Sequence, residues 1–250
     1  MFINGILHNS EAWSDVSIED IKMLEDVDEY LLRSIFKAHS KTALEFLHLE
    51  TGTKPIRFII ASRRLNYLPN ILNRPENELI RRVYEAQKQK TTKGDWIEMV
   101  RKDFDLIEEV FDEETIKSMT KNKFKKFVKS KIEMAALKYL EKLKLKHSKI
   151  KDVIYKKLKI QPYILSNKLT NDEINTLFAV RSRMTKVKRN FSNQFGQHLF
   201  CTLGCLYEEN QAHLLECKFI IDKLEDKTIL VECEYSDLFG SINLQIEIAK

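Results

Sequence analysis

The amino-acid sequence predicts a mostly α-helical protein. Six glycines and four prolines among 250 residues are too few for the many tight turns of a β-sandwich or β-barrel. Apolar residues recur at three- and four-residue intervals over most of the chain, which is the period of one helix face. We expect a helical bundle region over residues 1–160. Residues 161–250 should form a basic segment, a small zinc-knuckle module with at most one short β element, and a C-terminal helix.

Two capping boxes predict the starts of helices. In such a box a Ser or Thr hydroxyl and an acidic side chain three residues later each accept a hydrogen bond from the other's backbone amide. Thr170 and Glu173 open one of these helices. Ser17 and Asp20 open an earlier one. Its apolar stripe is Ile21, Leu24, Val27, Leu31, Leu32, Ile35 and Phe36.

Prolines delimit the helices that follow. Pro55 lies near the start of a helix whose apolar residues are Ile56, Ile59, Ile60, Leu65 and Leu68. Pro69 should kink or end this helix, because proline removes a backbone donor and clashes with the preceding turn. Pro75 opens a further helix. Its expected inward face is Leu79, Ile80, Val83 and Tyr84.

The longest predicted helix runs from Thr120 to about Lys146. Its core face contains Phe124, Val128, Ile132, Ala136 and Leu140, and most of its lysines fall on the opposite face. Near the end of the chain we expect a strand at Lys227–Cys233 and a helix at Tyr235–Lys250.

Lysines dominate the middle of the chain. Between Lys117 and Lys159 only Glu133, Glu141 and Asp152 oppose them. Such a run is either a ridge that neutralises phosphates or the solvated face of a helix. The candidates for contact with nucleic acid are Lys123, Lys125, Lys126 and Lys129.

A second basic cluster lies just before the cysteine-rich segment. It consists of Arg181, Arg183, Lys186, Lys188 and Arg189. Phe191 and Phe195 follow at once, and these rings could stack on unpaired bases or belong to a core. We include the five basic residues among the candidates for binding RNA or DNA.

Three of the four cysteines and one histidine occur in the pattern C-x3-C-x7-H-x3-C. The four residues are Cys201, Cys205, His213 and Cys217. Thiolate and imidazole are preferred Zn²⁺ ligands, and four protein ligands make a closed structural site. The alternatives are that the cysteines are small buried hydrophobic residues, or that His198 replaces His213 as a ligand. Cys233 has no partner in the pattern.

The sequence gives little support for catalysis. It contains no Walker A motif, no G-x-S-x-G, no H-E-x-x-H and no paired aspartates of the polymerase type. It also has no apolar run of transmembrane length and no signal-peptide pattern. We therefore expect a non-enzymatic protein of the cytoplasm or nucleus, without a membrane partner.

Several runs of residues resemble the C-terminal, post-palm region of non-LTR retrotransposon reverse transcriptases. They are LHNSEAW (7–13), LLRSIFKAHSKTALEFLHLETGTKPIRFIIASRRLNYL (31–68), ELIRRVYEAQKQKTTKGDW (78–96), CTLGCLYEENQAHLLEC (201–217) and YSDLFG (235–240). The resemblance implies a mostly helical region ending in a zinc knuckle that helps to hold template RNA or target DNA. Carried over by position, Cys201, Cys205, His213 and Cys217 are the knuckle ligands. The catalytic aspartates, fingers and palm of that family are absent from this sequence.

The sequence thus favours a non-catalytic chain that binds RNA or DNA and could accompany a catalytic reverse transcriptase chain. Three alternatives remain open. The helices and the zinc could serve only to fold the chain and dock it on a partner protein. The chain could also be a non-functional remnant of a retroelement. Polymerase activity would require a catalytic domain supplied elsewhere.

Overall fold

The computed structural model describes residues 5–185, 187–191 and 199–218. These residues form a mostly α-helical chain, which confirms the predicted fold class. Within the described ranges there is no β-strand, and the β structure is limited to an isolated bridge between Phe200 and Glu208. The expected strand at Lys227–Cys233 and the expected helix at Tyr235–Lys250 lie outside the described residues. No helix in the described part of the chain is both long enough and apolar enough to span a membrane.

The chain divides into two compact units, each assembled from three segments. Unit 1 contains residues 1–31, 52–142 and 155–159, and unit 2 contains residues 32–51, 143–154 and 160–250. This division differs from the expected boundary near residue 160. The difference arises because residues 32–51 of the first part of the chain pack with the helix that begins at Asn171, as described below. The two units are described separately.

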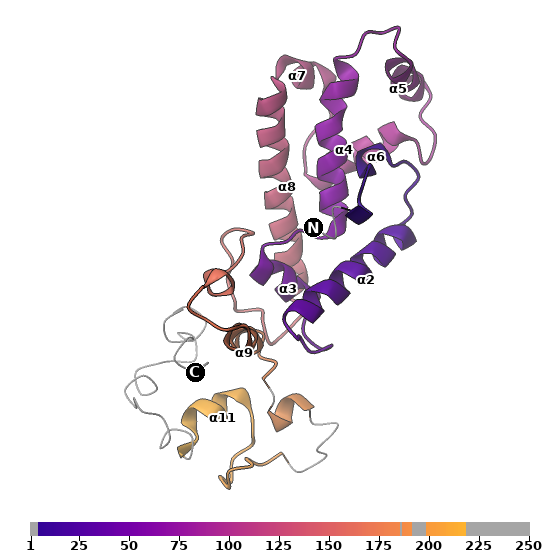
Figure 1. Ribbon diagram of the computed structural model, residues 1–250. Coiled ribbons are helices and arrows are strands. Elements are labelled where there is room, and N and C mark those ends of the chain that lie inside the picture. The colour runs from indigo at the N-terminus through magenta and orange to yellow at the C-terminus, as the bar shows by residue number, and fades with distance from the viewer. Residues whose placement is uncertain (1–4, 186, 192–198, 219–250) are drawn as a thin grey trace. The chain divides into compact units, whose positions relative to one another are not determined.

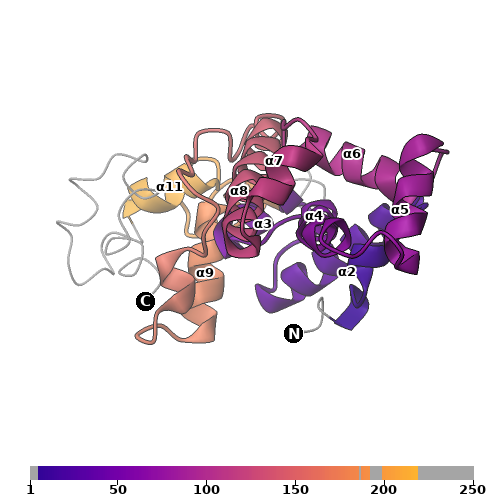
Figure 2. The same ribbon diagram turned by 90° about the horizontal axis from the view of Figure 1, so that it is seen from above.

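Unit 1 is built around two long helices. Its elements are η1 (Ser10–Ala12), the first part of α2 (Ile18–Ile35), α4 (Ile56–Leu72), α5 (Leu79–Gln89), α6 (Trp96–Leu106), α7 (Glu113–Ser118) and most of α8 (Lys121–Lys144). Helices α4 and α8 lie side by side in both views (Figure 1, Figure 2). Their apolar faces form one core with α6, and the predicted core face of α8 is buried from Phe124 to Leu140. The capping box of Ser17 and Asp20 is formed at the start of α2.

Helices α4 and α5 of unit 1 differ in part from their predictions. Helix α4 continues through Pro69 and ends at Leu72, so of the two predicted effects of this proline, a kink or an end, the helix does not end there. On α5 Tyr84 is buried, as predicted, but the other expected inward residues, Leu79, Ile80 and Val83, are exposed, and Arg81 is buried in their place. Tyr84 packs edge-on against Trp96 and donates a hydrogen bond to Glu113, so a polar contact decides which face of α5 turns inward.

Unit 2 contains the shorter elements. They are the end of α2, α3 (Leu44–Thr51), η2 (Pro162–Leu165), α9 (Asn171–Arg181), η3 (Lys188–Phe191) and α11 (Gln211–Glu216). Phe178 of α9 stacks on Phe36 with ring centroids 4.6 Å apart and also contacts Phe46 of α3. The capping box of Thr170 and Glu173 fixes the start of α9, as predicted. These aromatic contacts explain why residues 32–51 belong with α9.

Candidate metal centre and nucleic-acid interface

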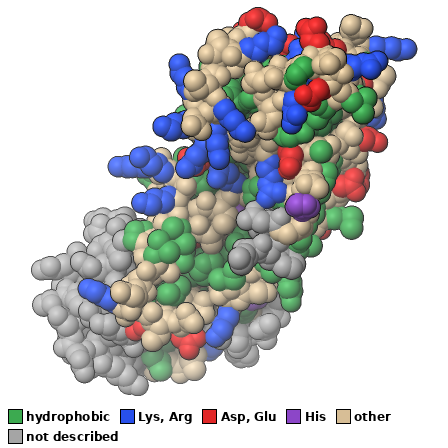
Figure 3. All heavy atoms as spheres, turned by 45° about the horizontal axis from the view of Figure 1, so that its top comes forward, with side chains coloured by type: hydrophobic (Ala, Val, Ile, Leu, Met, Phe, Trp, Pro, Cys, Tyr) green, Lys and Arg blue, Asp and Glu red, His purple; other side chains and the backbone are tan. Residues whose placement is uncertain are grey.

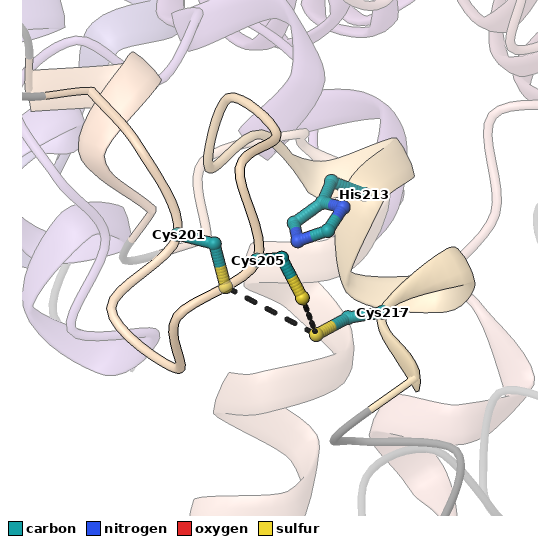
Figure 4. A group of neighbouring side chains, drawn as sticks. All are labelled: Cys201, Cys205, His213 and Cys217. Atoms are coloured by element: carbon teal, nitrogen blue, oxygen red, sulfur yellow. Dashed lines mark hydrogen bonds between the residues drawn. The ribbon is translucent and has the colours of Figure 1, made fainter.

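The first two cysteines of the motif lie on a tight turn of unit 2. The amide of Cys201 donates to the carbonyl of Tyr207 over 2.9 Å, and the amide of Gly204 donates to the carbonyl of Cys201. Gly204 has φ 90°, a left-handed conformation that only glycine adopts without strain. The turn brings the sulfur of Cys205 back toward that of Cys201 (Figure 4).

The other two candidate ligands lie on α11. The side chain of Asn210 accepts a hydrogen bond from the amide of His213 over 2.9 Å and so caps the helix. His213 is within the helix and Cys217 is its C-cap residue, four positions later. This spacing places both side chains on one face of the helix, toward the turn that carries Cys201 and Cys205 (Figure 4).

The four ligand atoms lie within 4.8 Å of one another and could hold a metal ion. The sulfur of Cys217 is 3.3 Å from that of Cys205 and 4.0 Å from that of Cys201, so none of these cysteines is in a disulfide. A tetrahedral ion with metal–sulfur bonds of about 2.3 Å would set its sulfurs about 3.8 Å apart. The two sulfur–sulfur distances bracket this value.

Two further observations fit a bound cation. His213 is buried, and its Nε2 atom has no hydrogen-bond partner among the described residues. Burial raises the pKa of Cys205 to about 11, and the sulfurs of Cys217 and Cys201 act in the same direction. The thiol of Cys205 therefore resists ionisation unless a positive ion stabilises its thiolate. His198, the alternative ligand, lies outside the described residues.

Residues of the basic cluster before the four candidate ligands make contacts inside unit 2. Arg181 is buried, and its guanidinium makes two 2.8 Å hydrogen bonds to the carboxylate of Glu50. The expectation that Arg181 belongs to an exposed basic surface is therefore wrong, because a buried carboxylate needs its charge.

The other members of this cluster are placed as follows. Arg183 is half-buried, with a guanidinium nitrogen 3.9 Å from Asp152. Lys188 donates to the carbonyl of Phe200, and Arg189 pairs with Glu208 over 2.7 Å. Lys186 lies outside the described residues. The contacts of Lys188 and Arg189 hold η3 against the turn that carries the first two cysteines.

The candidate lysines of α8 have a different environment. Lys123, Lys125, Lys126 and Lys129 are all exposed, and none has an acidic partner among the described residues. Further along the helix, Lys131 pairs with Glu109 and Lys138 with Glu108. Lys and Arg side chains gather over the side of unit 1 on which α8 lies (Figure 3). The first half of α8 thus has an excess of positive charge.

Lys125 borders a polar hollow of about 510 Å³ in unit 1. The other lining residues come from η1, the residues before it, and α4. They are His8, Asn9, Glu11, Arg63, Asn66, Tyr67 and Asn70. The Oδ1 atom of Asn66 is buried without a hydrogen-bond partner in the described structure. Two cations, a histidine, three amide side chains and the carboxylate of Glu11 therefore converge at one place, where the guanidinium of Arg63 also donates to the carbonyl of Leu7.

Sequence reasoning did not identify the residues of this hollow. His8, Arg63 and Asn66 are far from the α8 lysines in sequence, and none of them belongs to a motif. Arg63 looks like an ordinary flanking charge of an amphipathic helix. Only the packing of α4 and α8 brings these residues beside Lys125.

Comparisons of the chain with protein-family models, with curated proteins and with solved structures found no match in any of the three.

Proposed function

We propose that this chain binds RNA or DNA as a non-catalytic part of a retrotransposon reverse transcriptase. In this proposal the Cys201, Cys205, His213 and Cys217 cluster holds a structural zinc ion. The α8 lysines and the adjacent polar hollow contact the sugar–phosphate backbone. The resemblance of the residue runs to the post-palm region of that family supports the assignment of the chain to a reverse transcriptase.

The observation that carries the proposal is the arrangement around Lys125. Four exposed lysines without acidic partners among the described residues lie on the first half of α8. One of them, Lys125, lines a hollow that also contains Arg63, His8 and the unsatisfied Oδ1 atom of Asn66. Guanidinium and ammonium groups neutralise phosphates, and side-chain amides and imidazole bond to phosphate and sugar oxygens. A solvated helix face requires only the lysines, so the convergent hollow favours a binding role.

The zinc ion would stabilise the folded structure. Three thiolates and one imidazole complete a tetrahedral shell, which leaves no position for a catalytic water. When bound, the ion would join the Cys201–Cys205 turn to α11, two short elements that have little core of their own. Lys188 and Arg189, which bond the same turn, would then be held in place as well.

The test is a fluorescence-anisotropy titration of the zinc-loaded chain with structured RNA, single-stranded DNA and duplex DNA at several salt concentrations. The key variant replaces Lys123, Lys125, Lys126 and Lys129 with Gln. Because each lost phosphate contact lowers the slope of log K against log salt by about 0.7–0.9, the variant should lose about 3 units of slope if all four contact phosphates.

A matched control replaces four other exposed lysines of unit 1, Lys22, Lys90, Lys93 and Lys102, with Gln. This control removes the same charge and should leave most of the slope intact. Equal losses in the two variants would show that only net charge matters and would refute an interface on α8. No binding at low salt would refute nucleic-acid binding altogether.

A second candidate function is docking on a partner protein. The described part of α2 exposes Met23, Val27 and Tyr30, which follow one another at helical spacing, and α5 exposes Leu79 and Val83. Exposed apolar side chains at such spacing are typical of a face that packs on another chain. Nucleic-acid affinity that barely changes with salt would favour this candidate, because binding to phosphates weakens steeply as salt rises.

A further inference from the structure

Unit 2 contains a cavity of about 570 Å³ that is separate from the metal cluster. Its walls come from the segment between α2 and α3, from α9, and from the residues up to the end of η3. This volume is within the range of about 300–1,000 Å³ that is usual for small-ligand sites. The functions considered so far do not use this cavity.

The cavity has aromatic walls. Phe36 and Phe178 stack on one another with ring planes 18° apart. Phe191 of η3 meets the ring of His39 edge-on, with centroids 4.9 Å apart. All four of these residues line the cavity. Flat aromatic walls favour a flat ligand that can stack on them.

Three unsatisfied polar groups belong to residues that line the cavity. The hydroxyl of Thr42 is buried without a hydrogen-bond partner in the described structure. The amide of Asn175 and the Nε2 atom of His39 also have no partner among the described residues, but both side chains are only half-buried. His39 accepts a hydrogen bond at Nδ1 from the amide of Lys41, so the neutral ring carries its proton on Nε2. The site thus offers both donors and acceptors, as an amide or a heterocycle requires.

Basic side chains lie beside the aromatic walls. Lys149 donates to Asn190 over 2.6 Å and lies 3.5 Å from the sulfur of Met184, which lines the cavity. Burial lowers the pKa of Lys149, and so does the nearby charge of Lys41. Lys37 also lines the cavity, paired with Asp172 at its exposed edge. Cations next to an aromatic cavity suit a ring that carries a phosphate.

From these observations we propose that the cavity binds one unpaired nucleobase, with the amide of Asn175 and the hydroxyl of Thr42 at its polar edge and Lys149 near its phosphate. This inference rests on the proposed function when the base belongs to RNA or DNA. The same chemistry would recognise a free nucleotide, and the experiment separates the two sources. A purely aliphatic ligand would leave the buried hydroxyl of Thr42 unsatisfied and would cover the half-buried Asn175 and His39 without giving them a hydrogen bond, which is costly.

The experiment compares two single-stranded DNA oligomers of equal length, one with adenine bases and one abasic, at a single salt concentration. Both carry the same phosphates, so a difference in affinity reports the bases. Because stacking on aromatic side chains stabilises a bound base, the adenine oligomer should bind about tenfold more tightly or better. Asn175→Ala, Thr42→Val and Phe191→Leu should each reduce this ratio. Asn171→Ala, an exposed position on the same helix, is the control and should leave it unchanged.

Each outcome decides one proposal or the other. Equal binding of both oligomers overturns the base site and leaves the α8 interface standing. If neither oligomer binds, the proposed function fails, and equilibrium dialysis with adenosine monophosphate decides the cavity. Dialysis binding that Asn175→Ala weakens and Asn171→Ala does not would assign the cavity to a free nucleotide. No dialysis binding would overturn the base site as well.

Discussion

Replacing Arg181 with Met should destabilise unit 2 strongly. The side chain of Arg181 is 7% exposed and that of Glu50 is 0% exposed. Glu50 accepts two 2.8 Å bonds from the guanidinium and a 2.6 Å bond from the hydroxyl of Tyr163. The variant leaves the Glu50 carboxylate buried without its counter-charge. Breaking a buried ion pair from one side costs about 3–5 kcal/mol, so we expect a loss of this size in the free energy of unfolding.

Two further variants test the cause of this loss. Lys37→Met removes an exposed ion pair of the same unit, in which the side chains of Lys37 and Asp172 are 72% and 85% exposed. It should cost less than about 1 kcal/mol. The double variant Glu50→Leu with Arg181→Met removes both buried charges and should recover about 2 kcal/mol relative to the sum of the single variants.

The assay is urea unfolding at pH 7 followed by far-ultraviolet circular dichroism and by tryptophan fluorescence. Both tryptophans, Trp13 and Trp96, belong to unit 1, so the fluorescence midpoint is an internal control. If Arg181→Met costs no more than Lys37→Met, the buried pair is not formed and our assignment of Arg181 is refuted.

Two other predictions concern the metal and pH. Elemental analysis of the purified chain should find one zinc ion. The variant Cys217→Ser should lose this ion, whereas the control variant Cys233→Ser should keep it. Equal zinc content in the two variants would contradict the proposed ligand set. Burial lowers the pKa of His48 to about 4, so the folded chain stays neutral at this site while the unfolded chain takes up a proton below about pH 6.5. This contribution to the free energy of unfolding is therefore present above about pH 6.5 and is lost as the pH falls. In urea titrations the free energy of unfolding should decrease by about 2 kcal/mol between pH 7 and pH 5. The variant His48→Leu should lack this part of the pH dependence.

Local signals in the sequence were sufficient for much of the fold. The capping boxes at Ser17 and Thr170 were recognisable because their hydrogen bonds join residues three positions apart. The core face of α8 was recognisable because an exposed lysine face opposes it. The Cys/His cluster that could hold a metal ion was also predictable, since its four residues are close in sequence and of rare types.

Contacts between distant segments could not be predicted in this way. On α2 the carboxylate of Asp28 is buried while the neighbouring Val27 is 40% exposed. On α9 the buried cation is Arg181, whose partner Glu50 is 131 residues away. Helical periodicity predicts that apolar residues are buried and charged residues exposed. Tertiary packing can nevertheless bury a charge wherever a counter-charge or hydrogen-bond partner is available. The same limit explains why the hollow beside Lys125 gave no signal in the sequence.

The contacts that the basic residues already make limit how a zinc knuckle could contribute to nucleic-acid binding in this chain. Arg181 is paired with the buried Glu50. Lys188 and Arg189 form hydrogen bonds with residues next to the turn that carries the cysteines. A cation that is already paired with a carboxylate, as Arg181 and Arg189 are, gains little from a phosphate, because the ion pair must first be broken. The knuckle would therefore act by holding η3 and its Phe191 ring at the aromatic cavity. The unpartnered lysines of α8 would supply the salt-dependent part of the affinity.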